Sequence, residues 1–233
     1  DHLNQLLKKE AHQFKTVWIV CESIYSMDGD TASLSRLIQL KKQYHAKLIV
    51  DEAHSIGLYG KKGNGWINEL GYIKDVDIVL LTFGKAFGLV GAMLLSTEEI
   101  VSKMKEKCRS YIYSTALPLP MVAGIQKSCQ LIQESDDLRK ISRQNITLFK
   151  KNIQTNSNTH IQPIMIGEKK EAIQVEQSLI KKGYFCRAVH HPTVPKGQSR
   201  LRMTITALHT KGQIQALVTQ INDELNNLRQ KDE

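Results

Sequence analysis

The chain of 233 residues is 41% hydrophobic and carries a formal net charge of +9. No apolar run approaches the roughly 20 residues that a membrane helix needs, so the sequence predicts no membrane span. The lysines form dispersed doublets without a basic tail or interleaved aromatic residues, which argues against nucleic-acid binding. The four cysteines lack Cys-x-x-Cys spacing and predict reduced thiols in a cytoplasm, with no disulfide and no metal site.

Four short apolar runs predict the strands of one sheet. The first is followed by a stretch over 33–45 whose leucines and isoleucine recur at helical spacing, and a strand–helix–strand unit indicates a parallel pair in an α/β fold. Because the runs are apolar at successive positions, the sheet needs covering on both faces. The predicted strands span residues 16–21, 46–51, 76–83 and 91–96.

The second half of the chain predicts a smaller α/β unit. A long helical stretch without proline runs from about Met121 to Gln154 and is expected to bridge two domains. Strand-like runs then alternate with helical ones up to a final helix that starts at Lys211. The predicted organisation is part of a large α/β domain over 1–120, a bridging helix over 121–154 and a small C-terminal α/β domain over 155–233.

Polar side chains follow several of the predicted strands. Asp51 ends the strand of "LIVDEAHS" and His54 follows it, whereas Thr82 and Lys85 end the strand of "LLTFGKAFG". Ligands of open parallel sheets bind beyond the carboxyl ends of the strands, so these groups are expected to converge. Each residue taken singly is better explained by a structural role, such as a turn, a cap or a solvated loop, and only the combination favours chemistry.

Lys85 is the residue that favours a catalytic interpretation. It lies in a predicted apolar turn between glycines, where burying a free ammonium is costly. A lysine that binds pyridoxal phosphate as a Schiff base does not remain a free ammonium. That cofactor also needs a carboxylate for its pyridine nitrogen and a hydroxyl for its phosphate, and Asp51 and Thr82 supply these groups.

Five segments resemble the α-oxoamine synthases, a family within the fold type I (aspartate aminotransferase-like) pyridoxal-phosphate transferases. The segments are "ESIYSMDGD", "LIVDEAHSIGLYGKKGNG", "LLTFGKAFG", "YIYSTALP" and "PTVPKGQSRLRMTITALH". They occur in the family's order and spacing over nearly the whole chain. The resemblance implies an α/β fold made of the C-terminal part of the large domain and the small domain.

The resemblance also assigns roles to residues. It implies that Lys85 forms the Schiff base, that Asp51 binds the pyridine nitrogen and that His54 binds the phenolic oxygen with Ser26 beside it. Thr82 resembles a phosphate ligand. The implied substrate-side residues are Arg202, for the amino-acid carboxylate, and Thr193. Ser114 and Thr115 match a segment that reaches the cofactor phosphate of the other subunit of a homodimer.

The reaction implied by the resemblance joins an amino acid to an acyl-CoA or acyl-carrier-protein thioester. "PTVP" followed by "SRLRMTITALHT" favours the member that joins alanine to a pimeloyl thioester in biotin synthesis. The stretch His190-His191-Pro192 departs from that member's usual Arg-Pro-Pro, and "PKGQ" is shared with the member that uses glycine and an acetyl thioester. A serine-specific member with a long-chain acyl donor is the further alternative.

A reading of a different class is a non-catalytic fragment or paralogue that only dimerises. Family members carry a further upstream part, which supplies the ring stacked on the pyridine and a glycine loop for the phosphate. We therefore expect this chain to be a C-terminal portion, with weak cofactor binding by itself and an exposed strand edge or apolar patch.

Overall fold

The computed structural model describes residues 1–230, which divide into two compact units. Unit 1 comprises Asp1–Ile24 and Thr31–Asp136, and unit 2 comprises Tyr25–Asp30 and the chain from Asp137 onward. The loop Tyr25–Asp30 therefore groups with the second unit although its neighbours in sequence belong to the first. In the part of the chain that is described, no helix combines the length and apolar character that crossing a membrane requires.

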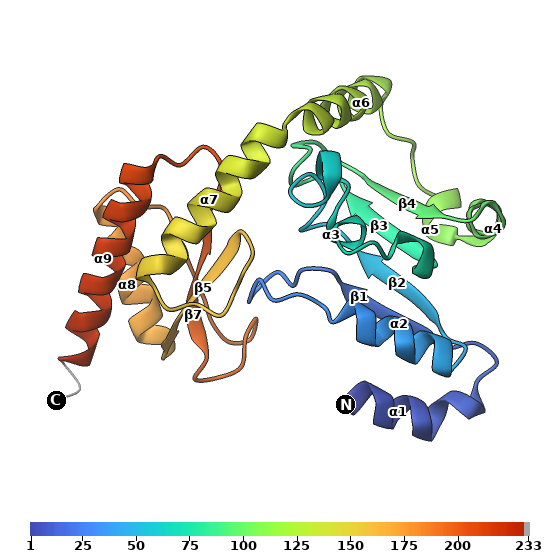
Figure 1. Cartoon of the computed structure of the whole chain (residues 1–233), viewed down its shortest axis with the longest axis horizontal. Coiled ribbons are helices and arrows are strands. Elements are labelled where there is room, and N and C mark those ends of the chain that lie inside the picture. Colours follow the sequence, from blue (N-terminus) through green and yellow to red (C-terminus); the bar gives the residue numbers. More distant parts are fainter. Residues whose placement is uncertain (231–233) are drawn as a thin grey trace. The chain divides into compact units, whose positions relative to one another are not determined.

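Unit 1 is built on a four-stranded sheet (Figure 1). Its strands, in spatial order, are β1 (Trp18–Glu22), β2 (Lys47–Asp51), β3 (Ile78–Thr82) and β4 (Ala92–Ser96). The first three strands are parallel, and β4 runs antiparallel to β3. Because parallel strands end at the same edge, the carboxyl ends of β1, β2 and β3 lie together.

Helices of unit 1 cover one face of this sheet. Ile19, Leu48 and Val50 point to that face and are buried in a cluster that includes residues of α2. Alternate residues point to the other face. There Trp18 is 45% exposed and Val20 is 66% exposed. The helices of the unit before residue 119 are α1 (His2–Glu10), α2 (Leu34–Gln43), α3 (Trp66–Glu69), α4 (Glu98–Lys107) and α5 (Arg109–Ile112).

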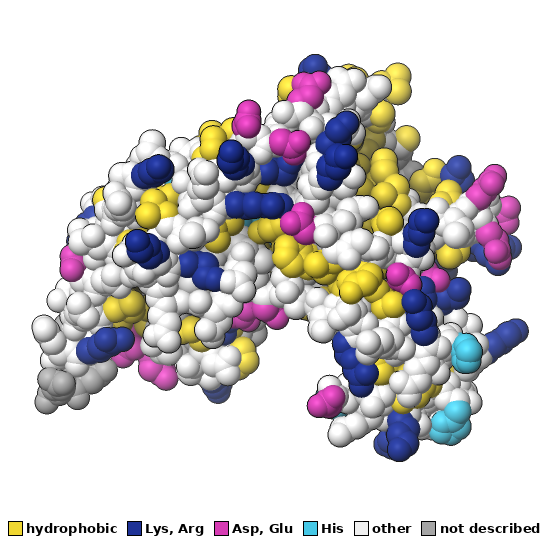
Figure 2. Space-filling model, viewed as in Figure 1, with side chains coloured by type: hydrophobic (Ala, Val, Ile, Leu, Met, Phe, Trp, Pro, Cys, Tyr) yellow, Lys and Arg dark blue, Asp and Glu magenta, His cyan; other side chains and the backbone are white. Residues whose placement is uncertain are grey.

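The sheet is therefore not covered on both faces within residues 1–230, and hydrophobic side chains reach the visible surface over it (Figure 2). The strands β1 and β4 each have a single neighbour among the described strands. The sequence predicted an exposed strand edge or apolar patch, and the exposed face and open edges agree with it.

The prediction of a single bridging helix over 121–154 is wrong, because the structure has two helices in this stretch. They are α6 (Leu119–Glu134) and α7 (Asp136–Asn152). Between them Ser135 leaves the helical conformation, with φ −96° and ψ 38°. Its hydroxyl donates to the carbonyl of Leu131 at 2.5 Å, a local bond that competes with helix continuation. The boundary between the two units follows at Asp136.

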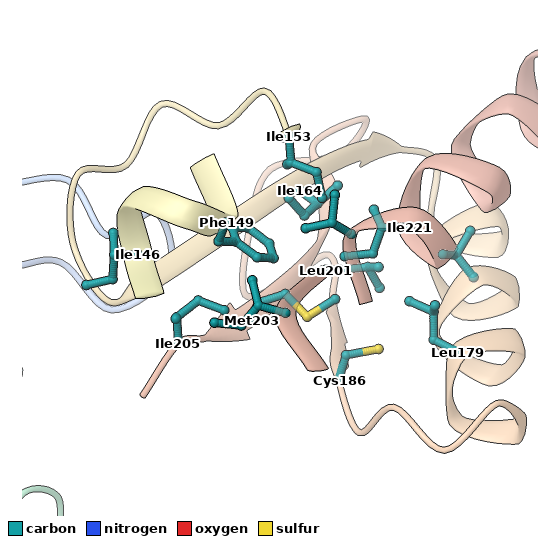
Figure 3. Packing of buried hydrophobic residues seen from close by; sticks show 13 residues of the cluster. Ile146, Phe149, Ile153, Ile164, Leu179, Cys186, Leu201, Met203, Ile205 and Ile221 are labelled. Carbon is teal, nitrogen blue, oxygen red and sulfur yellow. The ribbon is translucent and has the colours of Figure 1, made fainter. Parts of the chain in front are cut away.

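Unit 2 contains a three-stranded antiparallel sheet with helices α7, α8 (Lys169–Lys181) and α9 (Lys211–Arg229). The strand order is β5 (Ile161–Gly167), β7 (Ser199–Thr204), β6 (Arg187–Val189). Their apolar side chains form one core in which Phe149 and Leu201 are fully buried (Figure 3). The helix α9 begins with a capping box, because Thr210 and Gln213 each accept the other's backbone N–H.

Candidate functional site

Two predicted cofactor residues of unit 1, Asp51 and Thr82, lie at the carboxyl edge of its sheet. Asp51 is the last residue of β2 and Thr82 the last of β3, and the strand register places both side chains on the same face. Backbone hydrogen bonds continue past the strand ends. Ser23 donates its N–H to the carbonyl of Asp51 and Glu52 donates its N–H to that of Leu80, each at 2.9 Å. The edge that carries Asp51 is thus tied to both neighbouring strands.

One oxygen of the Asp51 carboxylate is already bound. Its Oδ1 accepts the backbone N–H of Ala53 at 2.7 Å, which closes a turn directly after the strand. This bond fixes the orientation of a half-buried carboxylate and leaves its second oxygen for another donor. A protonated pyridine nitrogen is a donor of the required kind.

Thr82 provides the test of whether a phosphate-bearing cofactor fits. Its hydroxyl oxygen is buried and has no hydrogen-bond partner among residues 1–230. Buried polar atoms are rarely left unsatisfied, and such an orphan points to a missing ligand atom. A phosphate oxygen accepts a hydroxyl proton, so the site is compatible with the phosphate group of pyridoxal phosphate.

Lys85 lies in an exposed turn, so the expectation of a buried apolar turn is wrong. The turn leaves the sheet edge beyond Phe83, which is itself buried, and residues 84–86 are open to solvent. Its shape is fixed by backbone bonds from Leu89 to Phe83 at 2.7 Å and from Gly88 to Lys85 at 3.0 Å. Gly88 adopts φ +68°, a conformation that side chains disfavour.

His54 lies in the turn that follows Asp51 and is half-buried. The N–H of Ser55 donates to the carbonyl of Glu52 at 2.9 Å, so His54 occupies an interior position of a hydrogen-bonded turn. Asp51 and His54 thus share one short segment at the end of β2, and their predicted roles stay predictions. Ser114 and Thr115 follow α5 in an exposed stretch, and their predicted contact with a partner subunit stays a prediction.

Three predicted residues belong to unit 2 instead. Arg202 on β7 is half-buried, and its Nε donates to the carbonyl of Ser26 at 2.6 Å. Its Nη1 donates to the hydroxyl of Thr204 at 3.3 Å. Burial lowers the pKa of the Arg202 guanidinium below its ordinary value. These two bonds orient the guanidinium and leave its other N–H groups for a carboxylate.

Ser26 and Thr193 line one pocket of unit 2, with a volume of about 440 Å³. The segment that carries Ser26 is anchored within this unit. The carbonyl of Gly29 accepts the hydroxyls of Ser157 at 3.0 Å and Thr159 at 2.9 Å. The other residues that line the pocket are Tyr25, Met27, Asp28, Asp30, Val194, Pro195, Gln198 and Arg200.

Sequence reasoning missed the side chains that hold the site residues in place. Glu52, Thr204 and the buried Arg200, whose guanidinium donates to Asp28, have no local pattern that distinguishes them from surface residues. The only usable signal was an acidic residue directly after a buried strand and before a glycine-rich loop. That pattern occurs just as readily in solvated turns.

The sequence matches the family described as aminotransferase class I and II over residues 1–221. It is 38% identical over 224 residues to the 8-amino-7-oxononanoate synthase of Chlorobaculum parvum, covering 94% of this chain and 57% of that protein. A serine palmitoyltransferase from S. paucimobilis with a bound PLP–myriocin aldimine has a similar structure. The TM-score is 0.87 at 27% identity, over 95% of this chain and 58% of that chain.

The 8-amino-7-oxononanoate synthase of Francisella tularensis also has a similar structure, with a TM-score of 0.84 at 29% identity. The similarity covers 97% of this chain and 67% of that chain. These matches confirm the resemblance inferred from the five motifs. The chain spans 57% of the length of the Chlorobaculum relative that it matches.

Proposed function

We propose a function from one premise: the chain belongs to the aminotransferase class I and II family and has the fold of the type I pyridoxal-phosphate transferases. In this proposal the whole protein is a pyridoxal-phosphate-dependent α-oxoamine synthase. It joins the α-carbon of an amino acid to the acyl carbon of a thioester, and the free thiol and carbon dioxide leave. One observation carries the proposal. The oriented Asp51 carboxylate and the buried Thr82 hydroxyl, which has no hydrogen-bond partner among residues 1–230, lie on the same face of the sheet.

The residues of this chain divide the work between binding and proton transfer. Pyridoxal phosphate, when bound, supplies a ring that withdraws electrons from the α-carbon of the amino acid. The second oxygen of Asp51 would accept the N–H of that ring and favour its charged form. Thr82 would donate its hydroxyl to the phosphate, and His54 and Ser26 are proposed to bind the phenolic oxygen. Lys85 would hold the cofactor covalently, and its Nζ would serve as the base for the α-proton of the amino acid.

Arg202 selects the amino acid by its carboxylate. A guanidinium held by Ser26 and Thr204 presents its remaining N–H groups in a fixed plane, which suits a two-point contact with a carboxylate. Thr193, in the pocket with Ser26, is proposed to contact the substrate. Ser114 and Thr115 are proposed to reach the cofactor phosphate of a second subunit, so the active assembly is a homodimer.

Among the substrates of the family we favour alanine with a pimeloyl thioester, the reaction of 8-amino-7-oxononanoate synthase in biotin synthesis. The support is the name of the curated relatives and the sequence from Pro192 to Thr210. The alternatives are glycine C-acetyltransferase and a serine palmitoyltransferase-like enzyme. The structural similarity to a serine palmitoyltransferase supports the second alternative. The proposed location is the cytoplasm.

The test is a thiol-release assay on the full-length protein with pyridoxal phosphate. Three substrate pairs are compared, namely alanine with pimeloyl-CoA, glycine with acetyl-CoA, and serine with palmitoyl-CoA. We expect the first pair to have the highest kcat/KM and Lys85→Ala to release no thiol with any pair. A preference for another pair would replace the proposed substrates. Amino-acid-dependent thiol release that survives Lys85→Ala would contradict the mechanism.

A further inference from the structure

The side chain next to Asp51 is a buried carboxylate that the proposed mechanism does not use. Glu52 is 1% exposed. Because successive residues of an extended chain point to opposite faces, its side chain lies away from the face that carries Asp51 and Thr82. Burial raises the pKa of Glu52, whereas its hydrogen bonds act in the opposite direction. A buried acid at this place needs an explanation.

Both oxygens of Glu52 bind the far end of the loop that begins with it. Oε2 accepts the backbone N–H of Trp66 at 2.7 Å, and Oε1 accepts that of Ile67 at 2.8 Å. The preceding residue, Gly65, has φ +95°. A Cβ at Gly65 would lie 1.9 Å from Oε2. The backbone therefore approaches the carboxylate as closely as only glycine permits.

Glu52 also connects the turn of His54 to the neighbouring strand. The hydroxyl of Ser55 donates to the carboxylate oxygen Oε2 of Glu52. The Ser55 hydroxyl also lies 2.9 Å from the hydroxyl of Ser23, which follows β1, and both serines are fully buried. The carboxylate thus joins three backbone segments: the end of β1, the turn after β2 and the residues that open α3.

From this arrangement we infer that Glu52 is a positioning residue for Asp51 and His54. Its carboxylate clamps the turn 52–55 from the face opposite the cofactor residues, and the N–H of Ala53 in that turn holds Oδ1 of Asp51. The inference rests on the proposed function for the roles of Asp51 and His54. Glu52 itself touches neither cofactor nor substrate in this proposal.

A purely structural alternative is that Glu52 only caps the start of α3. That role predicts a disturbance confined to residues 65–69 when the carboxylate is removed. The positioning role predicts that the turn 53–56 loosens as well, because the Ser55 bond and the clamp on the turn depend on the same oxygen atoms. The two roles can therefore be separated residue by residue.

The experiment is hydrogen–deuterium exchange on the 233-residue chain without cofactor, comparing Glu52→Gln with wild type. The glutamine side chain has one oxygen that can still accept a backbone N–H, but its NH₂ group replaces the other oxygen. One of the two buried N–H groups, of Trp66 or Ile67, therefore loses its acceptor. We expect faster exchange at 53–56 as well as at 65–69. The matched control is Glu69→Gln, which removes an exposed carboxylate that accepts the N–H of Gly60 in the same loop at 2.6 Å. Its exchange at 53–56 should equal that of wild type.

A second pair of variants covers the case that Glu52→Gln does not fold. Gly65→Ala pushes a methyl group into the Glu52 carboxylate, whereas Gly71→Ala meets nothing within 4 Å. Both glycines have positive φ, +95° and +77°, so an alanine is strained at either position. Only Gly65→Ala should accelerate exchange at 53–56. Wild-type exchange at 53–56 in both Glu52→Gln and Gly65→Ala would overturn the inference.

The full-length protein with pyridoxal phosphate gives a separate readout. Glu52→Gln should weaken cofactor binding about 10-fold, the scale of one unpaired buried donor. It should also reduce the visible circular dichroism per bound cofactor, since that signal requires a fixed pose. An unchanged signal per bound cofactor would overturn the positioning role. Failure of the wild-type protein to bind pyridoxal phosphate would instead contradict the proposed function. The exchange experiment would still show whether the Glu52 carboxylate holds the turn 53–56.

Discussion

The Nε of Arg202 lies 2.6 Å from the carbonyl oxygen of Ser26, a residue 176 positions earlier in the chain. The bond fixes the guanidinium plane of the residue that is proposed to bind the substrate carboxylate. A lysine is not expected to substitute for Arg202, because a lysine ammonium is a point charge without a planar fork.

Arg202→Lys should raise the KM for the amino acid far more than it lowers kcat. Loss of a two-point contact with a carboxylate costs on the order of 10- to 100-fold in affinity. The measurement is steady-state kinetics of the full-length protein with the amino acid varied. Arg187→Lys, on the exposed arginine of β6, is the control and should match wild type. An unchanged KM for the amino acid in Arg202→Lys would remove Arg202 from the binding role.

Borohydride reduction of the cofactor complex should leave a pyridoxyl group on the peptide that contains Lys85. The exposed lysines Lys61 and Lys62 are an internal control, since simple accessibility would label them as readily. Peptide mass spectrometry reads the modified residue. A label on other lysines with none on Lys85 would contradict the Schiff-base assignment.

Asp51→Asn should keep the fold and largely abolish carbanion chemistry. The asparagine carbonyl still accepts the N–H of Ala53, so the turn after β2 is preserved. The neutral amide no longer favours the protonated pyridine ring. Exchange of the α-proton of the amino acid with solvent should fall by at least about 100-fold. The control is Asp75→Asn, whose carboxylate makes a surface ion pair with Lys42. Wild-type exchange in Asp51→Asn would refute the role.

The stability of the chain should fall as the pH rises above 9. Burial raises the pKa of Cys21 and of Cys186 from 9.0 to about 11. The folded chain therefore favours the neutral thiols, and that contribution is complete below pH 9 and lost as the pH approaches 11. At most about 2–3 kcal/mol is involved for each thiol. Urea unfolding across this pH range measures it, and replacing both cysteines with alanine should flatten the profile.

The exposed sheet face should drive self-association of the 233-residue chain. Val20 and Trp18 offer apolar surface beside an open strand edge, and such surfaces favour contact with other chains. Sedimentation velocity at several concentrations should show association, and Val20→Glu should reduce it. Ser35→Glu, on the exposed surface of α2, tests whether charge alone is responsible. Equal behaviour of wild type and Val20→Glu would contradict this prediction.

Much of the fold could be predicted because its signals are local. The strand positions follow from β-branched apolar runs, and the observed strands β2 and β3 lie within the predicted ranges. The break at Ser135 was missed, since one side-chain bond to the preceding turn decides it. The exposure of Lys85 was missed as well, because a turn between two apolar segments gives no signal of which side faces solvent.

The candidate cofactor residues were proposed from the sequence through motifs, but the contacts that hold them in place were not predicted. Glu52 binds the N–H groups of Trp66 and Ile67, and Arg202 binds the carbonyl of Ser26. Backbone groups are the same at every position, so no sequence pattern reveals which of them a distant side chain binds. Such contacts require the folded chain.

The loop Tyr25–Asp30 makes unit 2 discontinuous in sequence, which limits how the protein can be dissected. A fragment that starts at Asp137 would retain Ser157, Thr159, Arg200 and Arg202 but lose the backbone carbonyls and the carboxylate that they bind. Those four side chains would then lack these hydrogen-bond partners. The shortest continuous fragment that contains all of unit 2 starts at Tyr25 and necessarily includes β2, β3 and β4.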